Sequence, residues 1–222
     1  PVTRFLLILN VAIFAGQIFF VQPGTEHYLR RLSLIPAEFW AGHGSWQPLT
    51  SMFLHGSVMH ILFNMIALYS LGIPIERTLG SGRFTWLYFV SGFTSAVAIL
   101  LFQFDSTDGT VGASGAIFGL LGALAVFYPD SMLLVFFFPM RARTAAVLML
   151  IASVLLTVFD IFPGVSHLGH AGGLLGGILY SRLALGMAPG QKLEPGPAGA
   201  FSGGVFRSRE ERLKEHLRTM FE

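Results

Sequence analysis

Six long apolar runs follow one another along the chain, separated by more polar segments. A helix needs about 20 residues to cross a hydrocarbon core of ~30 Å, and the runs reach or approach this length. They predict membrane-spanning helices at residues 4–21, 52–72, 84–103, 114–128, 144–162 and 168–187. The first run has one basic residue before it and further apolar runs after it, so we interpret it as a span rather than as a signal peptide.

The composition agrees with a membrane protein. Of the 222 residues, 53% are hydrophobic and only 12% are charged, whereas soluble domains contain roughly 25% charged residues. The 26 glycines suit close helix packing in lipid. Cysteine is absent, which excludes disulfides, a thiolate nucleophile and a cysteine-ligated metal site. The formal net charge of +2 is too small to indicate a nucleic-acid partner.

Lys and Arg are distributed unevenly between the two sides of the predicted bundle. If the N-terminus lies inside, only Arg30 and Arg31 fall on the outer side, and all other Lys and Arg residues fall on the inner side. Loops rich in Lys and Arg remain in the cytoplasm. We therefore expect a multi-pass protein of a bacterial cytoplasmic (inner) membrane, with both termini cytoplasmic.

Two segments between the spans are unusual. The first outer loop, at about 22–51, is long and contains Trp and Pro residues, so we expect part of it to insert into the membrane interface. The apolar stretch Met132–Met140 is too short to cross the membrane, and its Pro139 disfavours a helix. We expect this stretch to lie along the interface.

The C-terminal part differs from the rest of the chain. Residues 188–206 are rich in Gly and Pro and predict a linker. The charged segment after them has Leu213 and Leu217 at helical spacing, and we favour a solvated amphipathic tail over a partner contact. The predicted domains are a six-helix membrane domain at 1–187 and a linker with a cytoplasmic tail at 188–222.

Polar side chains inside the predicted spans are functional candidates, because lipid disfavours them. They are His55, His60, Asn64, Ser114, Asp160, His167 and His170. A single Ser in a span most often has a structural role, and a single His has one about as often as not, so it is their shared depth that favours a functional role. From Ser114 the fourth span has about 15 residues, or ~22 Å, which places Ser114 below the outer surface. The irregular backbone before Ser114 must then lie within protein or beside a water-filled cavity.

Ser114 and His170 are predicted to meet, because the fourth and sixth spans carry faces of small residues that allow close helix packing. These faces contain Gly115 and Gly119 in the fourth span, and Gly169, Gly173 and Gly177 in the sixth. A neutral imidazole, with a reference pKa of ~6.5, can take the proton of a serine hydroxyl at about 2.6–3.2 Å. Ser114 is therefore a candidate nucleophile and His170 a candidate general base.

His60 and Asn64 lie four residues apart and so share one face of the second span. Both side chains can donate hydrogen bonds, and with the Ser114 backbone N–H they are candidate donors to an oxyanion. Alternatively they hold the first outer loop in place, which is the role that we favour for His55. Asp160 is interpreted as a structural acid at a helix end, so we expect a Ser-His dyad rather than a triad.

Four separated pieces of the sequence resemble the rhomboid family of intramembrane serine proteases. They are HGSVMHILFN (55–64), PIERTLGSGR (74–83), GASGAIFG (112–119) and GHAGGLLGG (169–177). A G-x-S-G motif alone is weak evidence, but its combination with the preceding H-x-x-x-N and the following Gly-rich histidine helix is specific. The resemblance implies an all-α, six-helix bundle that cleaves peptide bonds in or near transmembrane segments, without a metal or other cofactor.

The resemblance also implies roles for individual residues. These are Ser114 as nucleophile, His170 as base, His60 and Asn64 as oxyanion donors, and Gly112, Gly115 and Phe118 as supporting residues. His170 is favoured over His167, because the base of the family precedes a Gly-rich helical stretch.

Two positions depart from the family pattern. Phe118 stands where relatives often have Tyr, so we expect ring stacking on His170 without a phenolic hydrogen bond. Trp46-Gln47 stands where a Trp-Arg pair is frequent. The anchoring of the first outer loop is therefore open.

Two rival functions remain. A metal-binding membrane protein or transporter could use His55, His60, His167 and His170 as ligands, but an H-E-x-x-H motif is absent and carboxylates are scarce in the spans. A rhomboid-like binding or quality-control protein without catalysis is disfavoured by the presence of both dyad residues. For a protease we expect transmembrane protein substrates and the lipid bilayer as partners, and no nucleic acid.

Overall fold

The structure, a computed structural model, describes residues 1–20, 26–135, 138–161 and 165–183. It is mostly helical, as predicted. The helices are α1 (Val2–Phe20), α2 (Glu26–Leu32), α3 (Pro36–Trp40), α4 (Gln47–Thr50), the 3₁₀ turn η1 (Ser51–Phe53), α5 (Val58–Leu79), α6 (Ser81–Phe102), α7 (Ser114–Phe127), α8 (Ala142–Val158) and α9 (His167–Leu183). The strands β1 (Met132–Val135) and β2 (Phe138–Arg141) form an antiparallel pair.

Among the described residues, α1, α5 and α6 are the helices long and apolar enough to cross a membrane. They correspond to the first three predicted spans. The other three predicted spans correspond to shorter helices, namely α7 with 14 residues and α8 and α9 with 17 residues each. The predicted linker and tail at 188–222 lie outside the described residues.

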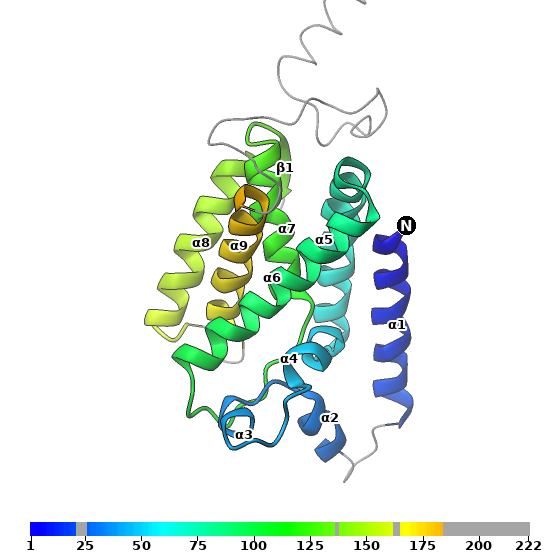
Figure 1. The fold of residues 1–222 in the computed structure, drawn as a ribbon, viewed down its shortest axis with the longest axis vertical. Helices are drawn as coiled ribbons and strands as arrows, with labels where there is room; N and C mark the ends of the chain where they lie inside the picture. The colour runs from blue at the N-terminus through cyan, green and yellow to red at the C-terminus, as the bar shows by residue number, and fades with distance from the viewer. Residues whose placement is uncertain (21–25, 136–137, 162–164, 184–222) are drawn as a thin grey trace, which may run out of the picture.

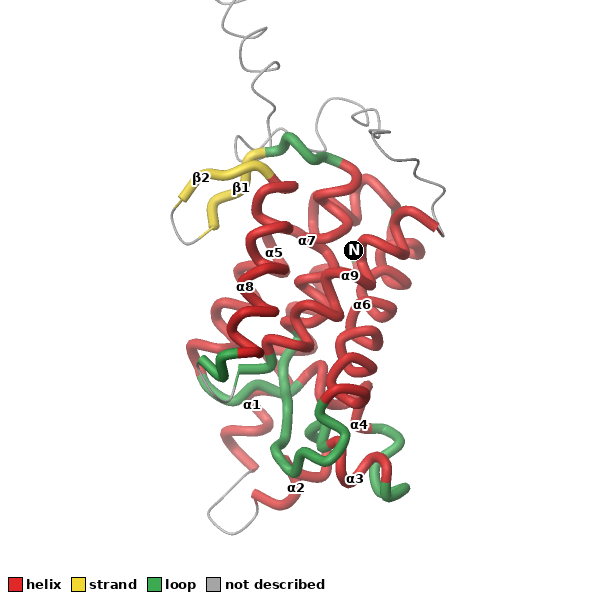
Figure 2. The backbone as a smooth tube through the Cα atoms, turned by 90° about the vertical axis from the view of Figure 1, so that its left-hand side faces the viewer, coloured by secondary structure: helices red, strands yellow, loops and turns green. Residues whose placement is uncertain are grey.

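Helix α7 lies in the middle of the bundle (Figure 1). Helices α6, α7 and α9 pack against one another, α8 packs on α7 and α9, and α1 packs on α5. Helices α2, α3 and α4 gather at one end of the bundle, and the β1–β2 pair lies at the opposite end (Figure 2). The first turn of α7 and the first turn of α9 both point toward the end that carries α2 to α4.

The glycine faces of α7 and α9 bring the two helices together backbone to backbone. A Cβ atom on Gly173 would overlap the backbone of Gly115, and one on Gly177 would overlap the backbone of Gly119. This close approach is the packing that the glycine spacing predicted. It determines the distance between the first turns of the two helices.

Helix α5 differs from its predicted bounds of 52–72. It begins at Val58, because Ser57 adopts an extended conformation and its Oγ accepts a hydrogen bond of 3.1 Å from the His60 N–H as an N-cap. The apolar residues before this cap form η1 and an extended connection instead. The helix then continues through Pro74 to Leu79.

Glu76, in the last turns of α5, anchors the first turn of α1. Its buried carboxylate accepts hydrogen bonds from Val2 N (2.6 Å), Thr3 N (2.8 Å), Thr3 Oγ1 (2.7 Å) and Ser81 Oγ (2.6 Å). A carboxylate at this place satisfies free N–H groups of the α1 N-terminus and has a favourable interaction with the helix dipole. It therefore ties α1 to the junction of α5 and α6.

The stretch Met132–Met140 forms much of the β1–β2 pair, which the sequence pattern did not predict. Leu134 lies opposite Pro139 in the register. Proline is tolerated in such an edge strand, where its missing N–H costs no ladder bond. Leu133 is buried against the core, whereas Leu134 is exposed.

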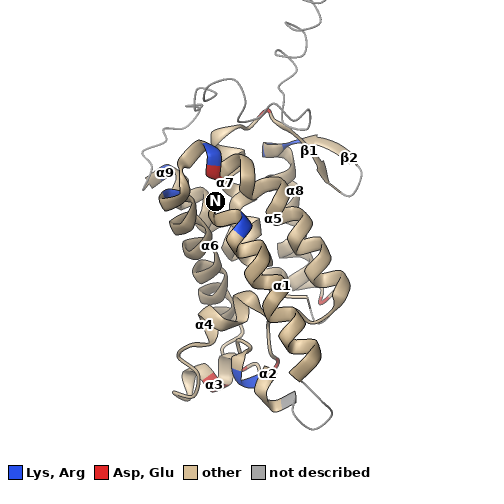
Figure 3. Ribbon diagram, turned by 90° about the vertical axis from the view of Figure 1, so that its right-hand side faces the viewer, with Lys and Arg blue, Asp and Glu red and all other residues tan. Residues whose placement is uncertain are grey.

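Charged residues gather toward the two ends of the bundle, and the helices between them are largely free of charged residues in the described part of the chain (Figure 3). Arg30 and Arg31 lie in α2 at one end. The other described Arg residues belong to the opposite half, which carries the β1–β2 pair. They are Arg4, Arg77, Arg83, Arg141, Arg143 and Arg182.

Candidate active site

Ser114 and His170 form a hydrogen bond between Oγ and Nε2 of 2.9 Å, although they are 56 residues apart in the sequence. Ser114 is the first residue of α7, and His170 lies in the first turn of α9. The expected contact between these two side chains is therefore present. When Nε2 carries no proton, the hydroxyl donates this bond, and the imidazole can accept its proton as a general base.

The Phe118 ring stacks on the His170 ring, with centroids 4.2 Å apart and planes 3° apart. This is the ring contact that the sequence predicted. His167 packs edge-on against His170 at 6.2 Å between centroids, and its Nε2 lies 2.9 Å from the Ile161 carbonyl oxygen. His170, not His167, is thus the histidine that is bonded to Ser114.

His60 faces the segment that leads into Ser114. A Cβ atom on Gly112 would lie 2.8 Å from His60 Nε2 and 3.6 Å from Ser114 Oγ. Gly112 also has a φ of 131°, which disfavours any other residue. The space between His60 and Ser114 is therefore open because residue 112 is glycine.

His60 has a donor that faces this region, and Asn64 follows one turn later in α5. The Gly56 N–H donates to His60 Nδ1 at 3.4 Å, so a neutral His60 carries its proton on Nε2, which faces Gly112. Asn64 is buried, and its Nδ2 has no hydrogen-bond partner within the described part of the chain. A buried amide without a partner is costly, so Asn64 Nδ2 stays a candidate donor to an oxyanion.

His55 and Asp160 lie away from the Ser114–His170 contact. The buried His55 ring packs edge-on against His60 at 5.1 Å between centroids, and the His55 backbone is bonded to the Gln17 side chain. Asp160 follows the end of α8 with a φ of 49°, and its N–H donates to the Thr157 carbonyl. The His55 ring nitrogens have no hydrogen-bond partner among the described residues, so the role of His55 in holding the first outer loop stays a prediction, as does the structural role of Asp160.

The first outer loop holds the backbone that precedes Ser114. Leu34 and Thr110 exchange two backbone hydrogen bonds of 3.0 and 2.9 Å, and Gly112 N donates to the Ser51 carbonyl at 2.9 Å. The loop therefore forms one wall of the site. A small cavity of about 30 Å³ lies beside this backbone, with Ser51, Ser95 and Gly112 among its lining residues. It has room for water, as expected where irregular backbone lies within a membrane protein.

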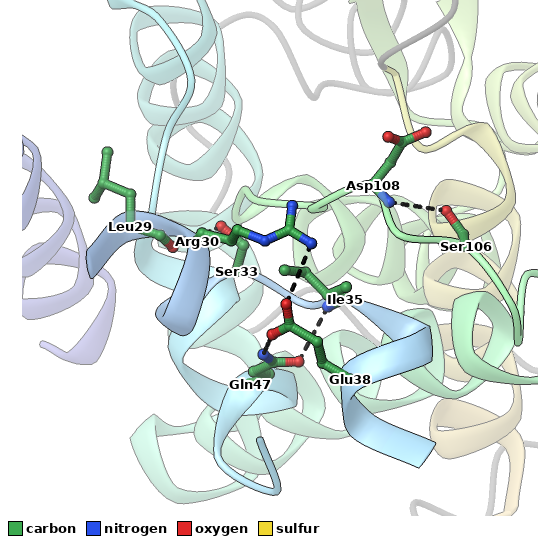
Figure 4. Close-up of polar contacts among 8 residues, drawn as sticks. All are labelled: Leu29, Arg30, Ser33, Ile35, Glu38, Gln47, Ser106 and Asp108. Carbon is green, nitrogen blue, oxygen red and sulfur yellow. Dashed lines mark hydrogen bonds and ion pairs between the residues drawn. The ribbon is translucent and has the colours of Figure 1, made fainter. Parts of the chain in front are cut away.

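Gln47 anchors the first outer loop in place of the arginine that is frequent at this position (Figure 4). It is buried, its Oε1 accepts from Ile35 N at 3.1 Å, and its Nε2 donates to Glu38 Oε2 at 3.3 Å. Arg30 pairs with the other oxygen of Glu38 at 3.2 Å. Glu38 thus links Arg30 of α2 to Gln47 of α4.

Sequence reasoning missed Gln17, and it noted Gln47 as a departure from the family pattern without predicting its bonds. Gln17 lies inside the predicted first span, where any amide side chain is costly unless it is bonded. That cost is the signal that could have identified it. Gln47 lies in a loop, where polarity carries no such signal.

Comparison with known proteins agrees with these features. The Rhomboid domain family model matches residues 42–186. The chain is 36% identical over 143 residues to Rhomboid protease GluP of Bacillus subtilis, covering 64% of this chain and 26% of that protein. It is 36% identical over 146 residues to RHOMBOID-like protein 4 of Arabidopsis thaliana, covering 65% and 35%. It is 31% identical over 204 residues to Rhomboid protease AarA of Providencia stuartii, covering 81% and 70%.

The chain spans a minor part of the first two relatives and most of the third. Its long apolar helices and these matches identify it as an integral membrane protein. Because the Rhomboid domain model matches more than half of its residues, the chain belongs to the rhomboid family.

Proposed function

We propose that this protein is an intramembrane serine endopeptidase that hydrolyses peptide bonds in or near transmembrane segments of membrane proteins. The observation that carries the proposal is the 2.9 Å contact between Ser114 Oγ and His170 Nε2 at one end of an apolar helical bundle. Two of the relatives described above are named rhomboid proteases.

In the first step, Ser114 Oγ attacks the carbonyl carbon of the scissile bond, and its proton passes to His170 Nε2. Negative charge then develops on the former carbonyl oxygen. The donors available to it are the Ser114 backbone N–H, His60 Nε2–H and Asn64 Nδ2–H. In serine proteases the loss of one such donor lowers kcat by about 10²–10³.

His170 next gives its proton to the leaving amine, which leaves the acyl group on Ser114 Oγ. A water molecule that His170 deprotonates then hydrolyses this ester and regenerates the enzyme. Phe118 supports the cycle by fixing the plane of the His170 ring, and Gly112 supports it by leaving space between His60 and Ser114. Gly115 supports it by letting the Ser95 side chain of α6 pack closely against the first turn of α7. The cycle uses no metal or other cofactor.

We place the protein in a bacterial cytoplasmic membrane with six spans and both termini in the cytoplasm. The concentration of Arg residues in the half with the β1–β2 pair supports this orientation (Figure 3). Helix α7, with 14 residues, is about 21 Å long, shorter than the ~30 Å of hydrocarbon. Ser114 therefore lies below the outer surface, with α2 to α4 at the outer interface.

We assign catalysis to the membrane domain at 1–187, with 188–222 as a solvated appendage. A chain that ends at residue 187 should then cleave substrate at the rate of the full chain. A large loss of activity in this truncated chain would contradict the assignment.

The deciding experiment incubates the purified protein in detergent with a transmembrane substrate. Ser114→Ala and His170→Ala should abolish cleavage, whereas His167→Ala should retain it, and a fluorophosphonate should label Ser114. Cleavage that survives Ser114→Ala would refute the mechanism. Loss of cleavage on addition of a chelator would support a metal-dependent protein, and absence of both cleavage and labelling would support a non-catalytic one.

A further inference from the structure

Gln17, near the end of α1, forms two hydrogen bonds to the backbone of His55 through its side-chain amide. Its Nε2 donates to the His55 carbonyl at 3.1 Å, and its Oε1 accepts from the His55 N–H at 3.1 Å. Two such bonds from one planar amide fix the orientation of the backbone as well as its position. Helix α1 thereby holds the segment that leads into α5.

The His55 carbonyl, which accepts the hydrogen bond from Gln17, belongs to the same peptide group as the Gly56 N–H. This group is planar, so fixing its C=O also fixes the direction of its N–H. The Gly56 N–H donates to His60 Nδ1 at 3.4 Å, a long hydrogen bond that depends on correct alignment. Gln17 is therefore connected to the His60 ring through one rigid peptide group.

This connection determines which nitrogen of His60 carries the proton. The Gly56 backbone N–H can only donate, so it selects the His60 tautomer in which Nδ1 is unprotonated and Nε2 is protonated. His60 Nε2 is the atom that faces Gly112 and the approach to Ser114. Ser57 Oγ, which accepts from His60 N at 3.1 Å, fixes the backbone of the same residue.

We propose that Gln17 is a positioning residue, which holds the His55–Gly56 peptide so that His60 presents Nε2–H to the oxyanion. The inference rests on the proposed function, because it assigns Gln17 to a donor of that mechanism. On this proposal α1, which contributes no group to the dyad, positions the His60 ring from outside the Ser114–His170 pair. The effect is expected in kcat rather than in KM, because an oxyanion donor acts mainly in the transition state.

The test is a double-mutant cycle measured as kcat and KM on a transmembrane substrate. Gln17→Met keeps the length of the side chain and removes both hydrogen bonds, and we expect it to lower kcat about tenfold, a fraction of what a lost donor costs. In the His60→Ala background the same change should have no further effect on kcat. An equal fold-change in both backgrounds would overturn the proposal.

Asn10→Ala is the control, because it removes a second amide, which is buried, from the same helix. It should lower the melting temperature and change kcat by the same small factor in both backgrounds. If Gln17→Met does not fold, Gln17→Glu takes its place, because it keeps the acceptor for the His55 N–H and loses the donor to the His55 carbonyl. It should show the same dependence on His60.

A spectroscopic readout separates this inference from the proposed function. In protein with ¹⁵N-labelled histidine, the His60 signals should report protonated Nε2 in the wild type and a mixture of tautomers in Gln17→Met. An unchanged tautomer in the variant would overturn the inference even if the wild type is active. Wild-type cleavage that does not depend on Ser114 would instead overturn the proposed function, and the His60 signals would still test the role of Gln17.

Discussion

The rings of Phe118 and His170 lie almost parallel, with 4.2 Å between their centroids and 3° between their planes. The stack fixes the plane of the imidazole, and the bond to Ser114 fixes its rotation within that plane. An aromatic pair of this kind is worth about 0.5–1.5 kcal/mol beyond the area that it buries. We therefore propose that Phe118 does for His170 part of what a third catalytic residue does in a triad.

Replacement of Phe118 tests this role. Phe118→Leu keeps the apolar character and loses the stack, and we expect kcat/KM to fall up to about tenfold, since ~1.36 kcal/mol corresponds to a factor of ten. Phe118→Tyr keeps the ring and should retain most of the activity. Steady-state cleavage assays compare the two variants, and a Leu variant as active as the wild type would contradict the role.

Gly112→Ala should block the site. The new Cβ would lie 2.8 Å from His60 Nε2, and the φ of 131° would add backbone strain of about 1–3 kcal/mol. We expect kcat, measured in the same cleavage assay, to fall by at least the ~10² that accompanies loss of an oxyanion donor.

Gly42→Ala is the control for the strain in that variant. Gly42 also has a positive φ, of 82°, but no atom lies within 4 Å of the position that its Cβ would occupy. This variant should lose stability and keep its kcat. Equal losses of kcat in the two variants would show that strain, and not obstruction of the site, explains the effect at Gly112.

The helices were predictable from the sequence, and some of their ends were not. A helix in lipid needs a long apolar run, so the pattern alone located α1, α6 and α7 to within a few residues. The start of α5 was misplaced, because the residues before Val58 include an apolar run of their own and a local cap at Ser57 decides the boundary. The β1–β2 pair was missed because four-residue strands leave too short a pattern.

The site was predictable only where helix periodicity carries the information. The close packing that lets Ser114 reach His170 followed from glycines at i, i+4 spacing on two spans, whereas the choice of this pair depended on the family resemblance. The bonds from Gln17 and Gln47 join a side chain to a backbone group 38 and 12 residues away. Such bonds depend on the course of the backbone in three dimensions and leave no periodic trace in the sequence.

Gly173→Ala should separate α9 from α7. The added methyl group would overlap the Gly115 backbone, so α9 has to move away from the helix that carries Ser114. We expect a destabilisation of about 1–3 kcal/mol, typical of overpacking, and a more than tenfold loss of cleavage, because a small misplacement of a catalytic group can cost up to about a hundredfold.

Gly82→Ala is the control for this helix substitution. Gly82 lies in α6 with open space around its Cβ direction. Alanine there should change stability by less than about 1 kcal/mol, because Gly82 lies in the first turn of α6 and glycine weakens mainly the middle of a helix. Thermal unfolding and cleavage assays compare the pair, and retention of full activity in Gly173→Ala would contradict the importance of the α7–α9 contact.

Gln47→Leu should release the first outer loop. The substitution keeps a buried side chain of similar size but leaves the Ile35 N–H without its acceptor and removes the bond to Glu38 (Figure 4). An unpaired buried donor costs about 1–3 kcal/mol. Since Leu34 pairs with Thr110 immediately before the Gly112–Ser114 segment, the loss should lower both the melting temperature and kcat.

Arg30→Ala distinguishes the contribution of the Gln47 hydrogen bonds from that of the neighbouring Arg30–Glu38 ion pair. The Arg30 side chain is 52% exposed, and its 3.2 Å contact with Glu38 belongs to a class of surface pairs worth about 0–1 kcal/mol. This variant should therefore differ little from the wild type in melting temperature and in cleavage. If Arg30→Ala lowered the melting temperature and the cleavage rate as much as Gln47→Leu, the Arg30–Glu38 ion pair and not the buried Gln47 amide would be the anchor. The melting temperature of the wild type would then fall with salt concentration, because exposed ion pairs are screened.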